Sequence, residues 1–383
     1  MIPFDYQPRT RIVFGPGKVD SLGALAGELG ARRVLLVSDP GIVKAGHAER
    51  GLDSLRKAGI TAVLFDGVEE NPTTDNVEAG TALARRHDPE LIVGLGGGSS
   101  MDCAKGIGIV ISNGRHILDF EGIDHVDTPG PPLICIPTTA GTSADVSQFA
   151  IINDIRRRVK ITIVSKTVVP DVALIDPVTT STMRAYLTAC TGMDALVHAV
   201  EAFVSTAHST LTDMHALEAI GLIHQTLVDT IAHPRDIALR SKMMMASLHA
   251  GLAFSNASLG AVHAMAHSLG GLLDLPHGEC NSLLLAPVMD FNFSEAEDRF
   301  QKMGEVMGLD GQGLTGSEKR RAVINKILAL KESAGILGGL AQRGVTRSDI
   351  PLLAKNALQD ACMATNPRLP DCRDIEVIYE HAL

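Results

Sequence analysis

Short apolar runs alternate with helical patterns through the first half of the chain. The segments 33–38, 61–65, 91–94, 133–136 and 172–175 each contain an apolar run of strand length, and a β-rich stretch lies at 149–165. Amphipathic stretches such as 51–58 and 76–86 separate the strands. Because strands that are buried on both faces read as continuous apolar runs, this alternation predicts a parallel sheet covered by helices on both faces.

The pattern changes after about Pro177. Strand-like runs almost disappear, and helical patterns follow at 193–205, 210–231, 237–255, 259–273, 294–307, 317–334 and 350–363. We therefore predict two domains. Residues 1–180 form an α/β domain with a parallel nucleotide-binding sheet, and residues 181–383 form an all-α domain.

Composition and charge narrow the class of protein. Hydrophobic residues make up 45% and charged residues 20% of the 383 positions, which is typical of a globular chain. The formal net charge of −10 argues against nucleic acid or an anionic membrane as a partner. The chain has no run of about 18 uninterrupted apolar residues, so we expect no membrane span.

The six cysteines form no CxxC pair, which argues against a thiolate zinc site or a redox pair. Most lie in apolar or glycine-rich surroundings, as reduced thiols of a cytoplasmic protein do. The first six residues show no basic region followed by an apolar one, so no signal peptide is expected. We therefore expect a cytoplasmic location.

A glycine-rich segment follows one of the predicted strands. Gly94-Leu-Gly-Gly-Gly-Ser-Ser100 comes after an apolar run and before residues that can start a helix. Backbone N–H groups of consecutive glycines can approach an anion closely, and a helix N-terminus adds its positive end. The segment therefore suits a phosphate cradle, although it lacks the GxGxxG spacing and could also be a simple turn.

Two other strand ends carry polar groups that suit a dinucleotide. Asp39 ends the first clear strand, where a carboxylate can bind both ribose hydroxyls of NAD and repel the 2′-phosphate of NADP. The same residue could instead cap a helix that begins at Pro40. The segment Pro137–Ser143 follows another strand, and its hydroxyl groups either line the same crevice or form a turn.

The second half of the chain holds five potential metal ligands: Asp194, His198, His263, His267 and His277. The first two are four residues apart in one helical pattern, and the next two repeat that spacing, so each pair shares a helix face. The last lies in a Leu-Pro-His-Gly stretch whose proline and glycine predict a tight loop. A single histidine on an apolar helix is usually a core residue, and only the convergence of five candidates favours a metal site.

An ionised aspartate in these apolar surroundings needs a charged partner. No Lys or Arg lies near Asp194 in sequence, and a divalent cation would supply the charge. A thiolate-free set of histidines with one carboxylate suits Fe²⁺ or Zn²⁺ better than Mg²⁺ or Ca²⁺. Spacing alone does not choose between His263 and His267 as ligand, or between iron and zinc.

At these residues the chain resembles the iron-containing (group III) alcohol dehydrogenases, nearly from end to end. The segments that carry the resemblance are Phe14–Gly17, Gly96–Lys105, Pro137–Thr142, Thr191–Ala199, Gly260–Gly270, Leu275–Gly278 and Thr365–Arg368. The two histidine-containing blocks together are highly specific, whereas the glycine block alone is not.

The resemblance implies a dehydroquinate synthase-like fold, with the active site in the cleft between an α/β domain and a helical domain. It implies that the metal ligands are Asp194, His198, His263 and His277. It places His267 beside the nicotinamide and the substrate, where the imidazole is a candidate to relay a proton. The alternative for His267 is packing behind the metal ligands.

The resemblance also implies the positions that bind cofactor and substrate. The NAD-binding positions are Asp39, Asn71, Gly97, Gly98, Ser99, Thr138, Thr139, Ser147 and Lys160. The substrate-pocket positions are Phe149, Phe254 and Cys362. The family commonly dimerises, and the β-like segment Thr10–Phe14 offers an edge for pairing, so we expect a homodimer or higher homo-oligomer.

The implied activity is hydride transfer between NAD(H) and a small primary alcohol or aldehyde at a divalent metal, Fe²⁺ ahead of Zn²⁺. Polyol and diol dehydrogenases (glycerol, 1,3-propanediol or lactaldehyde type) are the alternative. Asp145 stands where relatives often carry Glu, and Phe149 occupies a position that is polar in some diol-type relatives. The apolar Phe149 favours simple primary alcohols.

Two more distant functions fit less well. A dehydroquinate synthase-type cyclase or lyase needs several Lys and Arg around its phosphorylated substrate, and the flanks of the metal residues carry almost none. A metal-storing protein would need neither a phosphate cradle nor a ribose-binding carboxylate.

Overall fold

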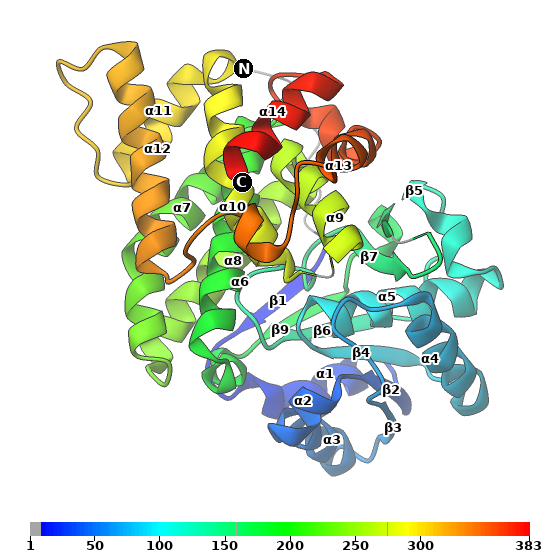
Figure 1. The fold of residues 1–383 in the computed structure, drawn as a ribbon. Coiled ribbons are helices and arrows are strands. Elements are labelled where there is room, and N and C mark those ends of the chain that lie inside the picture. Colours follow the sequence, from blue (N-terminus) through cyan, green and yellow to red (C-terminus); the bar gives the residue numbers. More distant parts are fainter. Residues whose placement is uncertain (1–8, 158, 274) are drawn as a thin grey trace. The chain divides into compact units, whose positions relative to one another are not determined.

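The computed structural model describes residues 9–157, 159–273 and 275–383 (Figure 1). Within them the chain forms two compact units. The α/β unit comprises the described residues up to 183 together with 235–244, and the helical unit comprises 184–234 and the described residues from 245 on. The expected lack of a signal peptide concerns residues that lie outside the described ones.

The predicted parallel sheet is confirmed. Its strands are β1 (Arg11–Phe14), β2 (Arg33–Val37), β3 (Thr61–Phe65), β4 (Leu91–Gly96), β6 (Leu133–Pro137) and β9 (Val172–Ile175). All pair in parallel, in the order β1-β9-β6-β4-β2-β3. The β-rich stretch forms a second sheet of β5 (Gly122–Ile123), β7 (Phe149–Asp154) and β8 (Val159–Val164), in which β7 and β8 are antiparallel.

Helices cover both faces of the parallel sheet (Figure 1). They are α1 (Leu22–Glu28), α2 (Pro40–Lys44), α3 (His47–Lys57), α4 (Thr74–His87) and α5 (Gly98–Asn113). Side chains of β2 alternate between the faces: Val34 and Leu36 pack with α1 and α3, while Leu35 and Val37 pack with α4 and α5. All four are fully buried, and burying such a side chain contributes roughly 1.5–3 kcal/mol, so both faces anchor the sheet.

The strand order reverses at the β2–β4 pair. From β2 the chain moves outward to β3, then returns to place β4 on the other side of β2. In open α/β sheets, ligands bind outside the carboxyl ends of the strands at such a reversal. The residues that follow these two strands include Asp39 and Gly97, so the fold brings two of the predicted cofactor positions to this point.

The predicted all-helical second region is also confirmed. Its helices are α6 (Ala185–Val204), α7 (Thr210–Ala232), α8 (Ile237–Ala257), α9 (Ala261–Leu273), α10 (His277–Asn292), α11 (Glu297–Val306), α12 (Gly316–Ser333), α13 (Ile350–Ala357) and α14 (Cys372–Ala382). The pattern at 350–363 covers α13 and then the 3₁₀ helix η7 (Ala361–Thr365). The first turns of α8 belong to the α/β unit.

The predicted tight loop around His277 is wrong. Pro276 precedes the first turn of α10, and His277 is the first residue of that helix. A Cβ atom on Gly278 would lie 2.2 Å from the carbonyl oxygen of Cys190 on α6, so this glycine permits close helix packing and does not form a turn. Proline followed by glycine is typical of turns, but proline also fits the start of a helix.

One helix of the described chain, α6, is long and apolar enough to cross a membrane by length and composition alone. Of its apolar window, 94% is buried inside the protein, and the core helix of a soluble protein passes the same test. This helix carries Asp194 and His198.

Candidate metal centre and cofactor-binding residues

Three of the predicted metal ligands meet in the helical unit. Asp194 on α6, His263 on α9 and His277 at the start of α10 have ligand atoms that all lie within 4.8 Å of one another. Asp194 Oδ1 lies 3.8 Å from His263 Nε2 and 3.9 Å from His277 Nε2. A tetrahedral cation with bonds of ~2.1 Å needs ligand separations of about 3.4 Å, so a small contraction would form the site.

His198, the predicted fourth ligand, lies one helical turn after Asp194 on α6. Its ring stacks on His263 with 4.6 Å between centroids, and on the predicted pocket residue Phe254 with 4.3 Å. Its side chain therefore lies beside His263, with the two ring planes nearly parallel.

The charge of the cluster fits a cation. Asp194 is 2% exposed, and its polar contacts among the described residues are Asn281 and two histidines, so no Lys or Arg neutralises it there. A buried carboxylate without a cationic partner is costly. Burial also lowers the pKa of His263 to about 3, so its ring is neutral and can offer a lone pair to a metal.

Glu201 orients His263 and was not predicted from the sequence. Its Oε2 lies 2.5 Å from His263 Nδ1, and its Oε1 accepts a 2.6 Å hydrogen bond from the backbone N–H of Val262. Burial raises the pKa of Glu201 to about 7. With the Nδ1 hydrogen directed to Glu201, Nε2 of His263 faces Asp194, which is the arrangement that metal-binding histidines commonly show.

Asn281 is a second residue that the sequence did not reveal. It lies one turn after His277 on α10 and is fully buried. Its side-chain nitrogen contacts Asp194 Oδ1, His263 Nε2 and His277 Nε2. The i, i+4 spacing from His277 would have indicated this contact if α10 had been recognised from the sequence.

His267 points to a different set of groups from His263. Its Nδ1 lies 2.8 Å from Oδ2 of Asp360, and Oδ1 of Asp360 accepts the backbone N–H of Cys362 at 2.8 Å. Burial alone would raise the pKa of Asp360, but the nearby His267 and the hydrogen bonds it accepts lower it to about 2. Burial, and then Asp360, raise the pKa of the Cys362 thiol well above its usual value. His267, Asp360 and Cys362 thus form a second compact group. It adjoins the first, because the His267 ring stacks on that of His277 with 5.2 Å between centroids.

The glycine-rich segment of the α/β unit leads from β4 into α5. Three of its glycines are explained by packing, because an added Cβ would lie within 2.4–3.1 Å of Ala104 at Gly94, of Ser100 at Gly96 and of Thr142 at Gly98. Gly97 differs: its φ of −74° suits any residue, and its nearest neighbour would be the Thr139 side chain at 3.5 Å. The fold therefore does not require glycine at this position.

Asp39 makes the capping bonds that one interpretation of the sequence predicts. Its Oδ1 accepts the backbone N–H groups of Gly41 at 2.9 Å and Ile42 at 3.0 Å, at the start of α2. Its Oδ2 accepts the Ser100 hydroxyl at 3.1 Å, in the first turn of α5. The carboxylate thus joins the ends of β2 and β4, and its role toward a ribose stays a prediction.

Three predicted cofactor positions are joined by direct contacts. Lys160 Nζ donates to Asn71 Oδ1 at 2.6 Å, and the backbone N–H of Asn71 donates to Ser99 Oγ at 3.3 Å. Asn71 has a φ of 57°, a left-handed conformation that asparagine tolerates better than most residues. These contacts bring the loop that contains Asn71, the first turn of α5 and strand β8 together.

The remaining predicted positions follow β6 or lie near β7. The backbone N–H of Thr138 donates to Gly96 O at 2.9 Å, which ties the end of β6 to the glycine segment. The hydroxyl oxygen of Thr139 is buried with no hydrogen-bond partner among the described residues. The carbonyl oxygens of Ser147 and Phe149 both accept from the buried Lys105, at 3.1 and 2.7 Å. These contacts hold the segment between β6 and β7 against α5.

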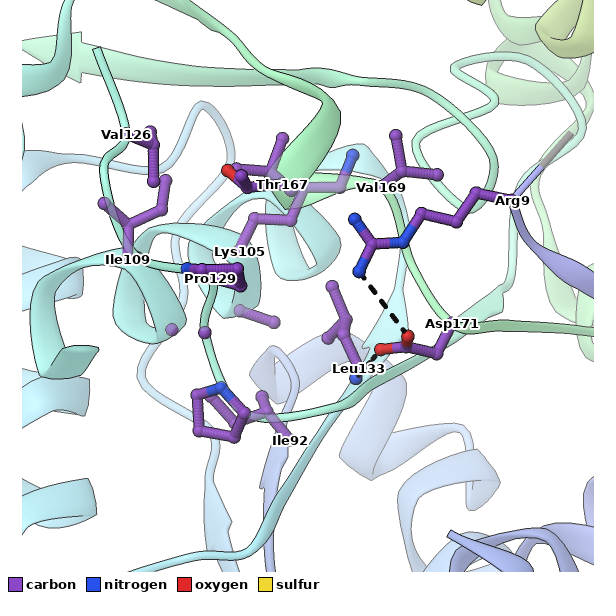
Figure 2. A pocket seen from close by; sticks show the side chains of 15 residues that line it. Arg9, Ile92, Lys105, Ile109, Val126, Pro129, Leu133, Thr167, Val169 and Asp171 are labelled. Atoms are coloured by element: carbon purple, nitrogen blue, oxygen red, sulfur yellow. Dashed lines mark hydrogen bonds and ion pairs between the residues drawn. The ribbon is translucent and has the colours of Figure 1, made fainter. Parts of the chain in front are cut away.

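A small cavity of about 30 Å³ lies elsewhere in the α/β unit (Figure 2). It adjoins Leu133, the first residue of β6, and Asp171, which bonds the Leu133 N–H at 2.9 Å and lies 4.0 Å from Arg9. This is the amino end of the strands, opposite to the end that Asp39 and Gly97 follow. The volume is about that of one water molecule, so this cavity cannot hold a dinucleotide.

The fold and the site define a class of protein that is built from two units. One part is a parallel-sheet unit of nucleotide-binding type, and the other is a helical unit that carries a cluster of histidines and one carboxylate. Residues 8–177 match the family described as iron-containing alcohol dehydrogenase, and residues 188–383 match the C-terminal domain of the Fe-containing alcohol dehydrogenase family.

Similar proteins support this class. The 1,3-propanediol dehydrogenase of Citrobacter freundii is 39% identical over 381 residues, which are 99% of this chain and 98% of that protein. The NAD-dependent methanol dehydrogenase of Bacillus methanolicus is 36% identical over 371 residues, 97% of each chain. A crystal structure of a 1,3-propanediol oxidoreductase superposes with a TM-score of 0.97 at 40% identity, covering 100% of both chains. The chain belongs to the iron-containing alcohol dehydrogenase family, and it is an oxidoreductase.

Proposed function

We propose that this protein transfers hydride between NAD(H) and a small primary alcohol or aldehyde, at an Fe²⁺ ion held by Asp194, His198, His263 and His277. The observation that carries the proposal is the buried carboxylate of Asp194, which faces two histidine Nε2 atoms and pairs with no Lys or Arg among the described residues. The family name supports iron, and the donor set would also suit zinc.

A divalent cation bound there would act as a Lewis acid toward an alcohol or carbonyl oxygen. The protein's own groups would do the rest. Glu201 fixes the tautomer of His263, and the Asp360 carboxylate fixes the Nδ1 hydrogen of His267. That leaves Nε2 of His267 able to accept and release a proton, which supports a role for His267 as a proton relay.

Two observations in the α/β unit support a bound dinucleotide. Gly97 lacks a side chain although neither its backbone conformation nor its neighbours require this, so a ligand that approaches the backbone would account for the glycine. The nearby Thr139 hydroxyl oxygen is buried and has no protein partner among the described residues, so it is left for such a ligand. NAD is favoured over NADP, because the Asp39 carboxylate would repel a 2′-phosphate.

The predicted pocket residues favour a small apolar chain on the substrate. Phe254 stacks on His198 beside the metal cluster, and Cys362 is buried with a thiol that stays protonated. Diols remain the second candidate, because a relative at 39% identity is named for 1,3-propanediol. Methanol and 1,3-propanediol share a primary hydroxyl, which is the chemistry that we propose for this chain.

The test is NADH formation by purified protein that has been stripped of metal and reloaded with Fe²⁺ or Zn²⁺ without oxygen. Straight-chain primary alcohols, 1,3-propanediol, 1,2-propanediol and glycerol are compared, with NAD and NADP in parallel. We expect absorbance at 340 nm with NAD and a primary alcohol, and no signal without metal. Equal turnover without metal, or no NADH formation with any of these primary alcohols, would contradict the proposal.

We also propose a homodimer or higher homo-oligomer in a reducing, cytoplasmic compartment. Strand β1 lies at the edge of the six-stranded sheet, which supports pairing with a second copy. All six cysteines are free and five are buried, which supports reducing surroundings. Light scattering after size exclusion would test the first part, because a monomer of 40.5 kDa would contradict it.

A further inference from the structure

The side-chain amide of Asn281 lies within hydrogen-bond distance of three of the predicted metal ligands. Its nitrogen is 2.6 Å from Asp194 Oδ1 and 3.1 Å from both His263 Nε2 and His277 Nε2. These atoms belong to three of the four residues of the proposed metal centre, so one NH₂ group contacts three ligands at once.

The Asn281 amide has fewer hydrogens to donate than there are acceptor atoms around it. An amide NH₂ has two hydrogens, so it can satisfy two of the three acceptors well and not the third. Its own oxygen, Oδ1, is buried and has no hydrogen-bond partner among the described residues. A fully buried asparagine in such a position needs an explanation other than the stability of the fold.

We infer that Asn281 is a positioning residue that holds Asp194, His263 and His277 together in the metal-free protein. Its weakly positive NH₂ group stands in for the cation among three electron-rich atoms. A cation and this NH₂ group need the same lone pairs, so each excludes the other. Metal binding therefore competes with the amide, and the amide weakens metal affinity while stabilising the metal-free fold.

The sign of the effect follows from linkage between binding and folding. Removing the NH₂ group leaves a buried carboxylate and two imidazoles without their donor, so the metal-free protein loses stability. In the metal-loaded protein the cation satisfies the same three atoms, so the loss there is smaller. The variant must then bind metal more tightly, by about tenfold for a lost hydrogen bond to a charged group.

The same helix offers a matched control. Asn292 is also buried on α10, and its amide pairs with Asn366 at 3.0 and 2.8 Å instead of with the metal ligands. Asn292→Ala should lower stability by the same amount with and without metal, and should leave metal affinity unchanged. Asn281→Leu is a second variant, of similar size, that removes the donor without adding a metal ligand, in case Asn281→Ala does not fold.

The experiment measures Zn²⁺ affinity by competition with a chromophoric chelator, and the unfolding temperature with and without Zn²⁺, on the full chain. For Asn281→Ala and Asn281→Leu we expect Zn²⁺ affinity to rise about tenfold and the difference in unfolding temperature between the metal-loaded and metal-free protein to widen. Unchanged or weaker Zn²⁺ binding by both variants would overturn the inference. The inference rests on the proposed metal centre. If the wild type does not bind Zn²⁺, both the metal centre and the role of Asn281 are overturned. If the wild type binds Zn²⁺ and the variants bind it no more tightly, only the role of Asn281 is overturned.

Discussion

The imidazole Nδ1 of His263 lies 2.5 Å from Oε2 of Glu201, and both side chains are almost fully buried. A carboxylate in this position fixes the ring and directs Nε2 toward Asp194. A metal centre built in this way depends on residues that do not touch the metal, and this leads to the first prediction.

Glu201→Gln should weaken metal binding about 10–100-fold, because the neutral amide holds the His263 tautomer less strongly. Chelator competition with the purified variant measures this. Glu279→Gln is the control, since Glu279 is also buried but pairs with Arg343 at 2.8 Å. The role of Glu201 is refuted if both variants bind metal equally well.

Asp360→Asn should lower kcat by about 10–100-fold while the bound metal stays unchanged. The amide can donate to Nδ1 of His267 and so favours the tautomer that cannot accept a proton at Nε2. Metal content and unfolding temperature, measured beside kcat, separate this effect from misfolding. Asp371→Asn is the control, because Asp371 only caps α14 and asparagine caps equally well. A normal kcat for Asp360→Asn would remove His267 from proton transfer.

Gly97→Ala should weaken NAD binding at least about tenfold with little change in stability. The protein leaves room for the added Cβ, so the fold tolerates it. The same space is needed for a pyrophosphate to approach the backbone, so the Cβ would hinder NAD. Isothermal titration calorimetry with NAD measures the affinity. Gly27→Ala in α1, where a Cβ meets no atom within 4 Å, should leave NAD affinity unaltered. If Gly97→Ala binds NAD normally, the glycine segment is only a turn.

Asp145→Asn should change how stability depends on pH. Burial raises the pKa of Asp145 to about 6 from 3.8, so the folded state holds a proton that the unfolded state releases. This group therefore stabilises the fold at low pH, and the contribution is lost as pH rises through about 6. Wild type should gain about 1 kcal/mol relative to the variant between pH 7 and pH 5. Urea unfolding of both proteins at both pH values tests this. The raised pKa is contradicted if wild type and variant differ in free energy of unfolding by the same amount at pH 5 and pH 7.

Much of the fold could be predicted because a buried strand or helix can be recognised from the apolar residues of its own segment. The apolar runs at 33–38 and 91–94 became β2 and β4 almost residue for residue, since strands covered on both faces admit few polar side chains. The pairing of Asp194 with His198 on one helix followed from spacing in the same way.

The residues that the sequence did not reveal act across long separations. Glu201 is 62 residues from His263, and Asp360 is 93 residues from His267, so only the folded chain brings these pairs together. Spacing could not tell His263 from His267, whereas the structure directs His263 to Asp194 and His267 to Asp360. Pro276 and Gly278 predict a loop at His277, and a loop gives no reason to place Asn281 beside it. In the structure both residues lie on α10, one turn apart.

The central claim is that one metal ion at these ligands is necessary for alcohol oxidation. The most direct measurement compares iron content and NADH formation in wild type and His277→Ala, both reloaded with Fe²⁺ without oxygen. We predict about one iron per chain with turnover in the wild type, and loss of both in the variant. A His277→Ala variant that keeps its iron and its turnover would contradict the claim.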